Sequence, residues 1–144
     1  MSQENLNKVF SQLGVLETIS AAKTLDVYDT GKIFSITQSG DAFAFTLPTA
    51  TTAQEASDLV GWNATFILTT ASTANVTIVR GDTSNDALEG SVATNGQDAL
   101  TGVTLATNVI TFSNDAVVGD RCHIVCVAAT ATATTFVATC HSNT

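Results

Sequence analysis

Alternation of apolar and polar residues is the strongest constraint on the fold of this chain, and it runs from Lys23 almost to the C-terminus. In DAFAFTLP, for example, Phe43, Phe45 and Leu47 occupy every second position before a proline ends the run. A period of two places alternate side chains on the same face of a strand. About ten such short runs, with turn signals roughly every 8 to 12 residues, predict an all-β fold, either a jelly-roll-like β-sandwich or a small barrel.

Several individual runs are predicted strands, and one is predicted to be helical. KTLDVY, GKIFSIT, RCHIVCVA and TTFVATC have strand patterns, while NATFILTT and NVTIVR are predicted to form a hairpin through ASTA. TTAQEASDLVGW is the interior helix candidate, about two turns long. Trp62, which follows a glycine and opens a strand, is expected to fill the core rather than to form a ligand platform.

The first twenty residues have a different period. The apolar residues of this segment are spaced three and four apart, which predicts one apolar stripe on a short helix ending near Gly14; they are Leu6, Val9, Phe10 and Leu13. A helix this short is not stable alone in water, so it is expected to dock on its own domain, on a sister chain or on a larger partner. The predicted organisation is an N-terminal arm, residues 1–20, followed by a single β domain, residues 21–144.

Composition excludes several classes of function. The 144 residues include 13 acids and 5 bases, giving a net charge of −8, and only 12% of the residues are charged. That balance disfavours binding to nucleic acid and to anionic membrane surfaces. No apolar run approaches the roughly 18 residues needed to span a bilayer, and the polar N-terminus lacks the apolar core of a signal peptide. We therefore expect synthesis in a cytoplasm.

The three cysteines all lie in the last two predicted strands. Cys122 and Cys126 share one face of a strand, and a turn centred on Ala131 would place Cys122 opposite Cys140. Directly opposed residues lie about 4.5 to 5.5 Å apart at Cα, within the range of about 4.4 to 6.8 Å that a disulfide accepts. A slip of two residues in the turn would change the partner. Three interpretations stay open: a disulfide within the chain, a bridge between subunits, and buried reduced thiols, which cytoplasmic synthesis favours.

No catalytic or metal site is expected. Cys122 and Cys126 would lie about 13 Å apart along a strand, too far for shared zinc ligation, and His123 points away from Cys122. Asp82, Ser84 and Asp86 alternate as at the start of a calcium loop, but the glycine and glutamate that complete such a loop are missing. Pairs of acids elsewhere have the spacing of solvated turn and helix surface; they are Asp26 with Asp29 and Glu55 with Asp58.

Longer segments resemble a known sequence pattern. DTGKIFSITQSGDAFAFTLP, a spacer, GWNATFILTT and then NVITFSNDAVVGDRCHIVC resemble a pattern of virion proteins of tailed bacteriophages. In that pattern a D-x-G-K-x-F strand leads to a strand ending in T-L-P, and an I-x-F strand precedes a G-D turn. The resemblance extends from about Asp29 to Cys140. Two departures are that Phe136-Val137 replaces a common aromatic pair and that cysteines stand where Val or Ser is usual.

The resemblance implies a structural function. The implied protein is a head decoration (cement) protein that binds the outer surface of the phage head. Its expected partners are the major capsid protein and further copies of itself, with which it would form a homotrimer. The apolar residues of the arm, Leu6, Val9, Phe10 and Leu13, would then contact the capsid or a sister subunit. The alternative is a tail fibre or spike module that recognises a host receptor. Exposed aromatic side chains or an acidic pocket would favour this alternative.

Overall fold

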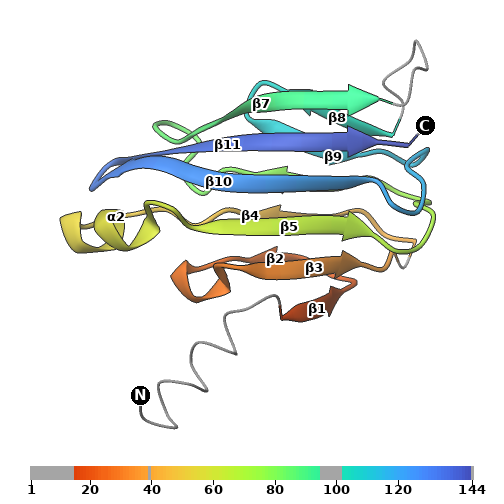
Figure 1. The fold of residues 1–144 in the computed structure, drawn as a ribbon, viewed down its shortest axis with the longest axis horizontal. Helices are drawn as coiled ribbons and strands as arrows, with labels where there is room; N and C mark the ends of the chain where they lie inside the picture. Colours follow the sequence, from red (N-terminus) through yellow and green to blue (C-terminus); the bar gives the residue numbers. More distant parts are fainter. Residues whose placement is uncertain (1–14, 39, 95–101, 144) are drawn as a thin grey trace, which may run out of the picture.

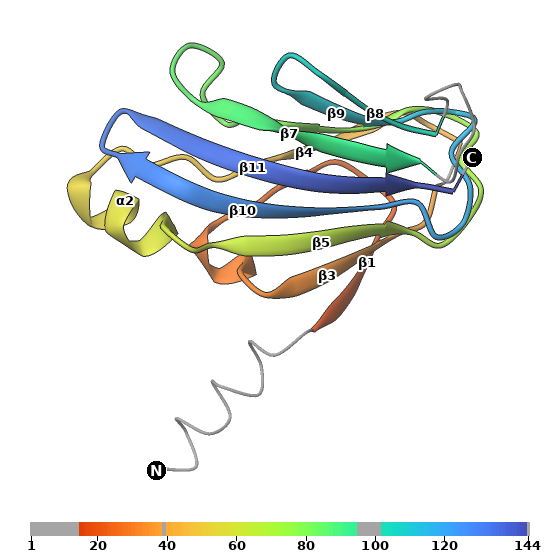
Figure 2. The ribbon, with the colours of Figure 1, turned by 45° about the horizontal axis from the view of Figure 1, so that its top comes forward.

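Two β-sheets pack face to face in the computed structural model, which describes residues 15–38, 40–94 and 102–143 (Figures 1 and 2). The six-stranded sheet has the order β1 (Leu16–Ile19), β3 (Lys32–Ile36), β5 (Asn63–Leu68), β10 (Arg121–Thr130), β11 (Ala133–Ser142) and β7 (Ala87–Thr94). The five-stranded sheet has the order β2 (Lys23–Thr24), β4 (Phe43–Thr46), β6 (Val76–Val79), β9 (Val109–Phe112) and β8 (Val103–Ala106). The prediction of an all-β, sandwich-like fold is confirmed.

The chain passes repeatedly from one sheet to the other. β3, β5 and β7 lie in the six-stranded sheet, whereas β4 and β6 lie in the five-stranded sheet. The predicted hairpin from β5 to β6 is therefore wrong, because these strands belong to opposite sheets and β5 pairs in parallel with β3. Each strand has one buried face, as the alternation indicates, but that alternation carries no information about which strand is its neighbour.

One predicted strand is much shorter than expected. KTLDVY is a strand only at Lys23–Thr24, and a 3₁₀ turn, η1 (Val27–Asp29), follows it. The Asp26 carboxylate accepts a hydrogen bond from the Tyr28 backbone N–H at 2.8 Å, and the Asp29 carboxylate accepts one from the Asp26 N–H at 3.0 Å. Such local bonds compete with the strand ladder, which explains the early end of β2.

The end of the expected N-terminal arm is part of the sheet. β1 pairs in parallel with β3, and the Val15 carbonyl accepts a hydrogen bond from the Ile33 N–H at 3.1 Å. The predicted stripe of Leu6, Val9, Phe10 and Leu13 lies outside the described residues.

The interior helix forms where it was predicted, as α2 (Ala53–Leu59). Thr52 caps it, because its hydroxyl accepts a hydrogen bond from the Glu55 N–H at 3.2 Å. The helix buries Ala56 and Leu59 against one end of the sandwich. None of the described residues belongs to a helix that is long and apolar enough to cross a membrane.

Aromatic rings from both sheets fill the core. The Phe66 ring lies 5.2 Å from the Phe34 ring and 5.0 Å from the Phe45 ring, measured between centroids, and all three residues are fully buried. Trp62 is 1% exposed, which confirms its predicted core position. Its indole N–H donates to the Asp26 carbonyl at 2.9 Å, so the buried polar atom is satisfied.

Candidate interaction surfaces

The cysteine strands pair in the predicted register. Cys122 lies opposite Cys140, with their Cα atoms 4.0 Å apart, and a disulfide joins them. The hairpin turn is centred half a residue beyond Ala131, between Thr130 and Ala133, but an irregularity in β10 between Cys126 and Ala128 restores the predicted pairing. The prediction was therefore correct only because two deviations from a regular hairpin compensate for each other.

The sulfur atoms do not reach the surface. Cys122, Cys126 and Cys140 are each at most 1% exposed. The Cys126 thiol is free, burial raises its pKa, and it contacts the Ala128 carbonyl at 3.5 Å. A disulfide between subunits was one of the interpretations left open by the sequence, but no sulfur atom of the described residues is exposed to form one.

The face of the six-stranded sheet that points away from the core is the broadest candidate surface. We call it the outer sheet face. Side chains at alternate positions of its strands point outward, and most of them are hydroxyl or aliphatic, with few charges. The outward residues include Leu16, Thr18, Ile33, Thr65, Ile67, Glu89, Ser91, Arg121, His123, Val125, Val137, Thr139 and His141. Leu16 is 63% exposed and Val137 is 39% exposed. An exposed aliphatic surface of this kind is typical of interaction sites.

Both histidines lie on the outer sheet face. Across β10 and β11, Arg121 faces His141 and His123 faces Thr139. The Nδ1 atom of His123 lies 3.0 Å from the Thr65 hydroxyl of β5. The side chains surround a hollow lined by Thr65, Ala93, Arg121, His123, Thr139, Cys140 and His141. His123 and the buried sulfur atoms thus lie on opposite sides of the sheet, so His123 cannot act as the base for a cysteine nucleophile.

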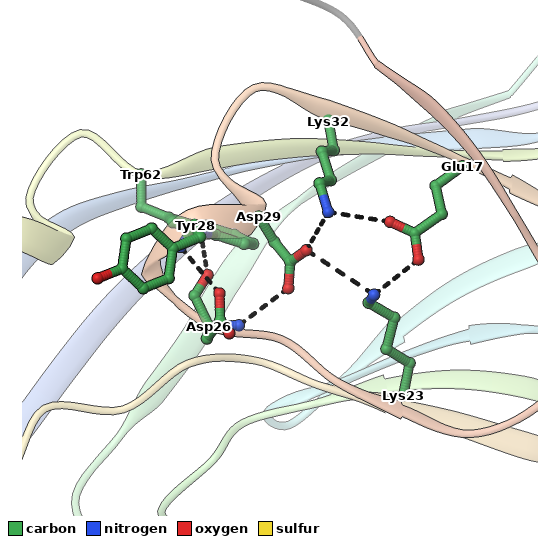
Figure 3. Close-up of polar contacts among 7 residues, drawn as sticks. All are labelled: Glu17, Lys23, Asp26, Tyr28, Asp29, Lys32 and Trp62. Atoms are coloured by element: carbon green, nitrogen blue, oxygen red, sulfur yellow. Dashed lines mark hydrogen bonds and ion pairs between the residues drawn. The ribbon is translucent and has the colours of Figure 1, made fainter. Parts of the chain in front are cut away.

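A second polar cluster closes one edge of the sandwich (Figure 3). We call it the ion-pair quartet; it consists of Glu17 on β1, Lys23 on β2, Asp29 in η1 and Lys32 on β3. The Lys23 ammonium lies 2.7 Å from one Glu17 oxygen, and the Lys32 ammonium lies 3.0 Å from the other. Lys32 also lies 2.7 Å from the Asp29 carboxylate. Because β1 and β2 are edge strands of different sheets, the quartet ties the two layers together.

The electrostatics of the quartet indicate a structural role. The hydrogen bond from Lys23, more than that from Lys32, lowers the pKa of the Glu17 carboxyl, whereas the hydrogen bond to Asp29 raises the pKa of Lys32. Two carboxylates and two ammonium groups neutralise each other and leave no free base. Asp29 is only 5% exposed, so the prediction that its carboxylate is solvated at the surface of a turn was wrong.

A cleft of about 360 Å³ lies beside the quartet, between η1, α2 and the ends of β4 and β6. Its walls are largely apolar and include Leu25, Leu47 and Leu59, while three acids also line it; these are Asp26, Glu55 and Asp58. Hydrogen bonds from Thr51 hold the pKa of the Glu55 carboxyl below its usual value. Tyr28, next to this region in the chain, is 83% exposed.

The acidic turn that resembled a calcium loop is held by its own hydrogen bonds. The Asp82 carboxylate accepts bonds from the Ser84 N–H and the Asn85 side chain, at 2.8 and 3.1 Å. The buried Asp86 carboxylate accepts bonds from the backbone N–H groups of Asp82 and Thr134, at 2.8 and 2.7 Å. Within the described ranges, no three His, Cys, Asp or Glu side chains gather as metal ligands would.

Comparison with family models, curated proteins and solved structures finds no match for this chain. The functional argument therefore depends on the surfaces described above. The sequence analysis had already considered the two histidines of the hollow on the outer sheet face, but it did not predict the ion-pair quartet. Its one sequence signal is the spacing of Asp29 and Lys32, which is too common to indicate a cluster.

Proposed function

We propose that this protein is a virion structural protein of a tailed bacteriophage, a capsid decoration (cement) protein that binds the outer surface of the head shell. The observation that carries the proposal is the outer sheet face, where aliphatic and hydroxyl side chains are exposed and charges are few. The resemblance of the segments from Asp29 to Cys140 to phage virion proteins supports the same function. The expected partners are the major capsid protein and two further copies of the chain.

The physical demands of that function fit the chain. A decoration protein must keep its shape while many copies bind one shell. The disulfide joins the two strands of the β10–β11 hairpin, and the quartet joins edge strands of the two sheets. Interfaces of standard size bury about 1,600 Å² in total, and repeated identical sites on a shell add avidity to a modest single contact. A weakly charged face suits such contacts because little charge must be desolvated.

The proposal is tested by co-sedimentation with head shells assembled from the major capsid protein of the same viral genome. Val137→Asp places a charge on the outer sheet face and is expected to weaken shell binding by at least about tenfold. Val118→Asp is the matched control, because Val118 is 59% exposed but lies in the loop before β10. Failure of the wild-type protein to sediment with shells, or equal binding by Val137→Asp, would refute the proposal.

The N-terminal segment provides a second test. The proposal assigns Leu6, Val9, Phe10 and Leu13 to a contact with the capsid or with a sister subunit. Removal of residues 1–14 should weaken shell binding or reduce the native mass from that of a trimer. Removal of residues 1–20 is not a clean test, because it also deletes β1 and takes Glu17 out of the quartet.

A specific observation favours a second candidate, a fibre or spike module that recognises a host surface. The acidic cleft and the exposed Tyr28 are the features expected of such a module. Binding of the protein to host cells that is lost in Tyr28→Ala and retained in Val137→Asp would support this candidate over decoration.

A further inference from the structure

Positive charge is unevenly distributed over the described residues. Lys23 and Lys32 are neutralised in the ion-pair quartet. The Arg80 guanidinium donates to the Asp86 carbonyl at 2.6 Å. The remaining basic side chains in the described ranges are Arg121, His123 and His141, and all three lie together on the outer sheet face. In a chain of net charge −8, this is a local reversal of sign.

The register brings the three side chains to one spot. Arg121 and His141 are directly opposed, and His123 lies two residues further along the same face of β10. Opposed residues and their neighbours two positions away are close enough for long side chains to meet. All three line the same hollow, whose remaining lining includes the hydroxyls of Thr65 and Thr139. The Thr139 hydroxyl is an additional hydrogen-bond donor, whereas the Thr65 hydroxyl is paired with His123.

The Arg121 guanidinium donates one hydrogen bond to the Gly119 carbonyl at 3.4 Å, which leaves its other N–H groups for a ligand. The Nδ1 atom of His123 pairs with the Thr65 hydroxyl, so its Nε2 atom is the one available to a ligand. The Nδ1 atom of His141 is buried without a hydrogen-bond partner. The ring nitrogen of His141 that can meet a ligand is therefore Nε2.

Among the described residues, no carboxylate lines this hollow. The outward positions of β5 that pair with β10 are Asn63, Thr65 and Ile67, none of which titrates. On β7, the outward acid is Glu89, which pairs with Val137 rather than with the row that contains His123. Within the described part of the chain, the donors of the hollow therefore face no internal anion.

We infer that Arg121, His123 and His141 form an anion-binding patch that takes a carboxylate side chain of the protein surface on which the outer sheet face docks. A guanidinium binds a carboxylate through two parallel hydrogen bonds, and such charge-assisted bonds are the strong ones. The assignment of the carboxylate to the head shell rests on the proposed function, whereas anion binding by the patch does not.

The patch is tested first without any shell, with a hexaglutamate peptide as the probe at low salt. The ring signals of both histidines should shift in NMR spectra as the peptide is added. Peptide binding is measured at about pH 5.5 and at about pH 7.5, which lie on either side of the ordinary histidine pKa. Arg121→Gln should weaken peptide binding by at least about tenfold, while the matched control Arg80→Gln should leave it unchanged.

Three results would overturn the inference. The first is the absence of peptide binding at either pH. The second is equal binding by wild type and Arg121→Gln. The third is displacement of the peptide by an equal concentration of inorganic phosphate, which would show that the patch takes small oxyanions in general. Equal thermal unfolding of both arginine variants provides the check that Arg121→Gln is folded.

Shell binding then separates the two proposals. Loss of both peptide and shell binding in Arg121→Gln supports the inference in full. Loss of peptide binding with unchanged shell binding refutes the shell as the source of the carboxylate. Peptide binding by a wild-type protein that does not bind shells refutes the proposed function and leaves the anion patch in place.

Discussion

Reduction of the Cys122–Cys140 disulfide should lower the free energy of unfolding by about 3 kcal/mol. The bond joins residues 18 apart in the sequence, and closure of a loop of this length restricts the unfolded chain by about that amount in the chain-entropy model. Both residues are at most 1% exposed, and reduction removes no heavy atom from the core, so no cavity is created. The total stability of a domain is about 5 to 15 kcal/mol, so this is a large fraction of it.

The assay is urea unfolding of the oxidised and the reduced protein. With a denaturant slope of about 1 to 3 kcal/mol per molar, the midpoint should fall by about 1 to 3 M on reduction. The double variant Cys122→Ala/Cys140→Ala should lose the dependence on reductant, and Cys126→Ala should keep it. Equal wild-type midpoints with and without reductant would refute the reasoning. So would three reactive thiols, instead of one, in the denatured, unreduced protein.

Three further predictions concern the quartet, the core and a glycine. The folded state lowers the pKa of the Glu17 carboxyl. The contribution of Glu17 to stability is therefore present above the pKa of the unfolded state, 4.5, and is lost as the pH falls through the lower pKa of the folded state. Glu17→Gln should flatten this part of the curve of stability against pH, measured by thermal unfolding. Phe66→Ala should cost about 3 to 5 kcal/mol in urea unfolding, because the ring is fully buried. Gly90→Ala should destabilise by more than about 2 kcal/mol, because the new Cβ would clash with the Ala138 carbonyl, whereas Gly40→Ala, also at positive φ but in open space, should cost only about 1 kcal/mol. Equal losses for the two glycine variants would contradict the clash argument.

The cysteine hairpin illustrates how far local reasoning extends. Alternation alone identified the faces of Cys122, His123 and Cys126, because a strand has a fixed period. The pairing of Cys122 with Cys140 needed a further assumption, a turn centred on Ala131, and a slip of two residues would have changed it. The irregularity at Val127, which makes that register correct, has no sequence signal that separates it from an ordinary strand residue.

The candidate sites were predicted less completely. Both histidines were placed in the correct hairpin, but their meeting with Arg121 and Thr65 in one hollow depends on the pairing of β10 with β5 as well as with β11. The acidic cleft was not predicted at all, since its walls come from four separate parts of the chain.

The sequence by itself determined the elements of this protein, and the tertiary structure decided their partners. The period of two specifies a buried face for each strand, and capping residues such as Thr52 and Asp26 specify where short helices begin, because these preferences act over a few residues. The assignment of β5 and β6 to opposite sheets depends instead on contacts between residues distant in the sequence. The ion-pair quartet also depends on the tertiary structure, although its members are close in the sequence. Its charges meet only after two sheet edges have packed against each other, and the buried Asp29 carboxylate would be costly without its lysine partners.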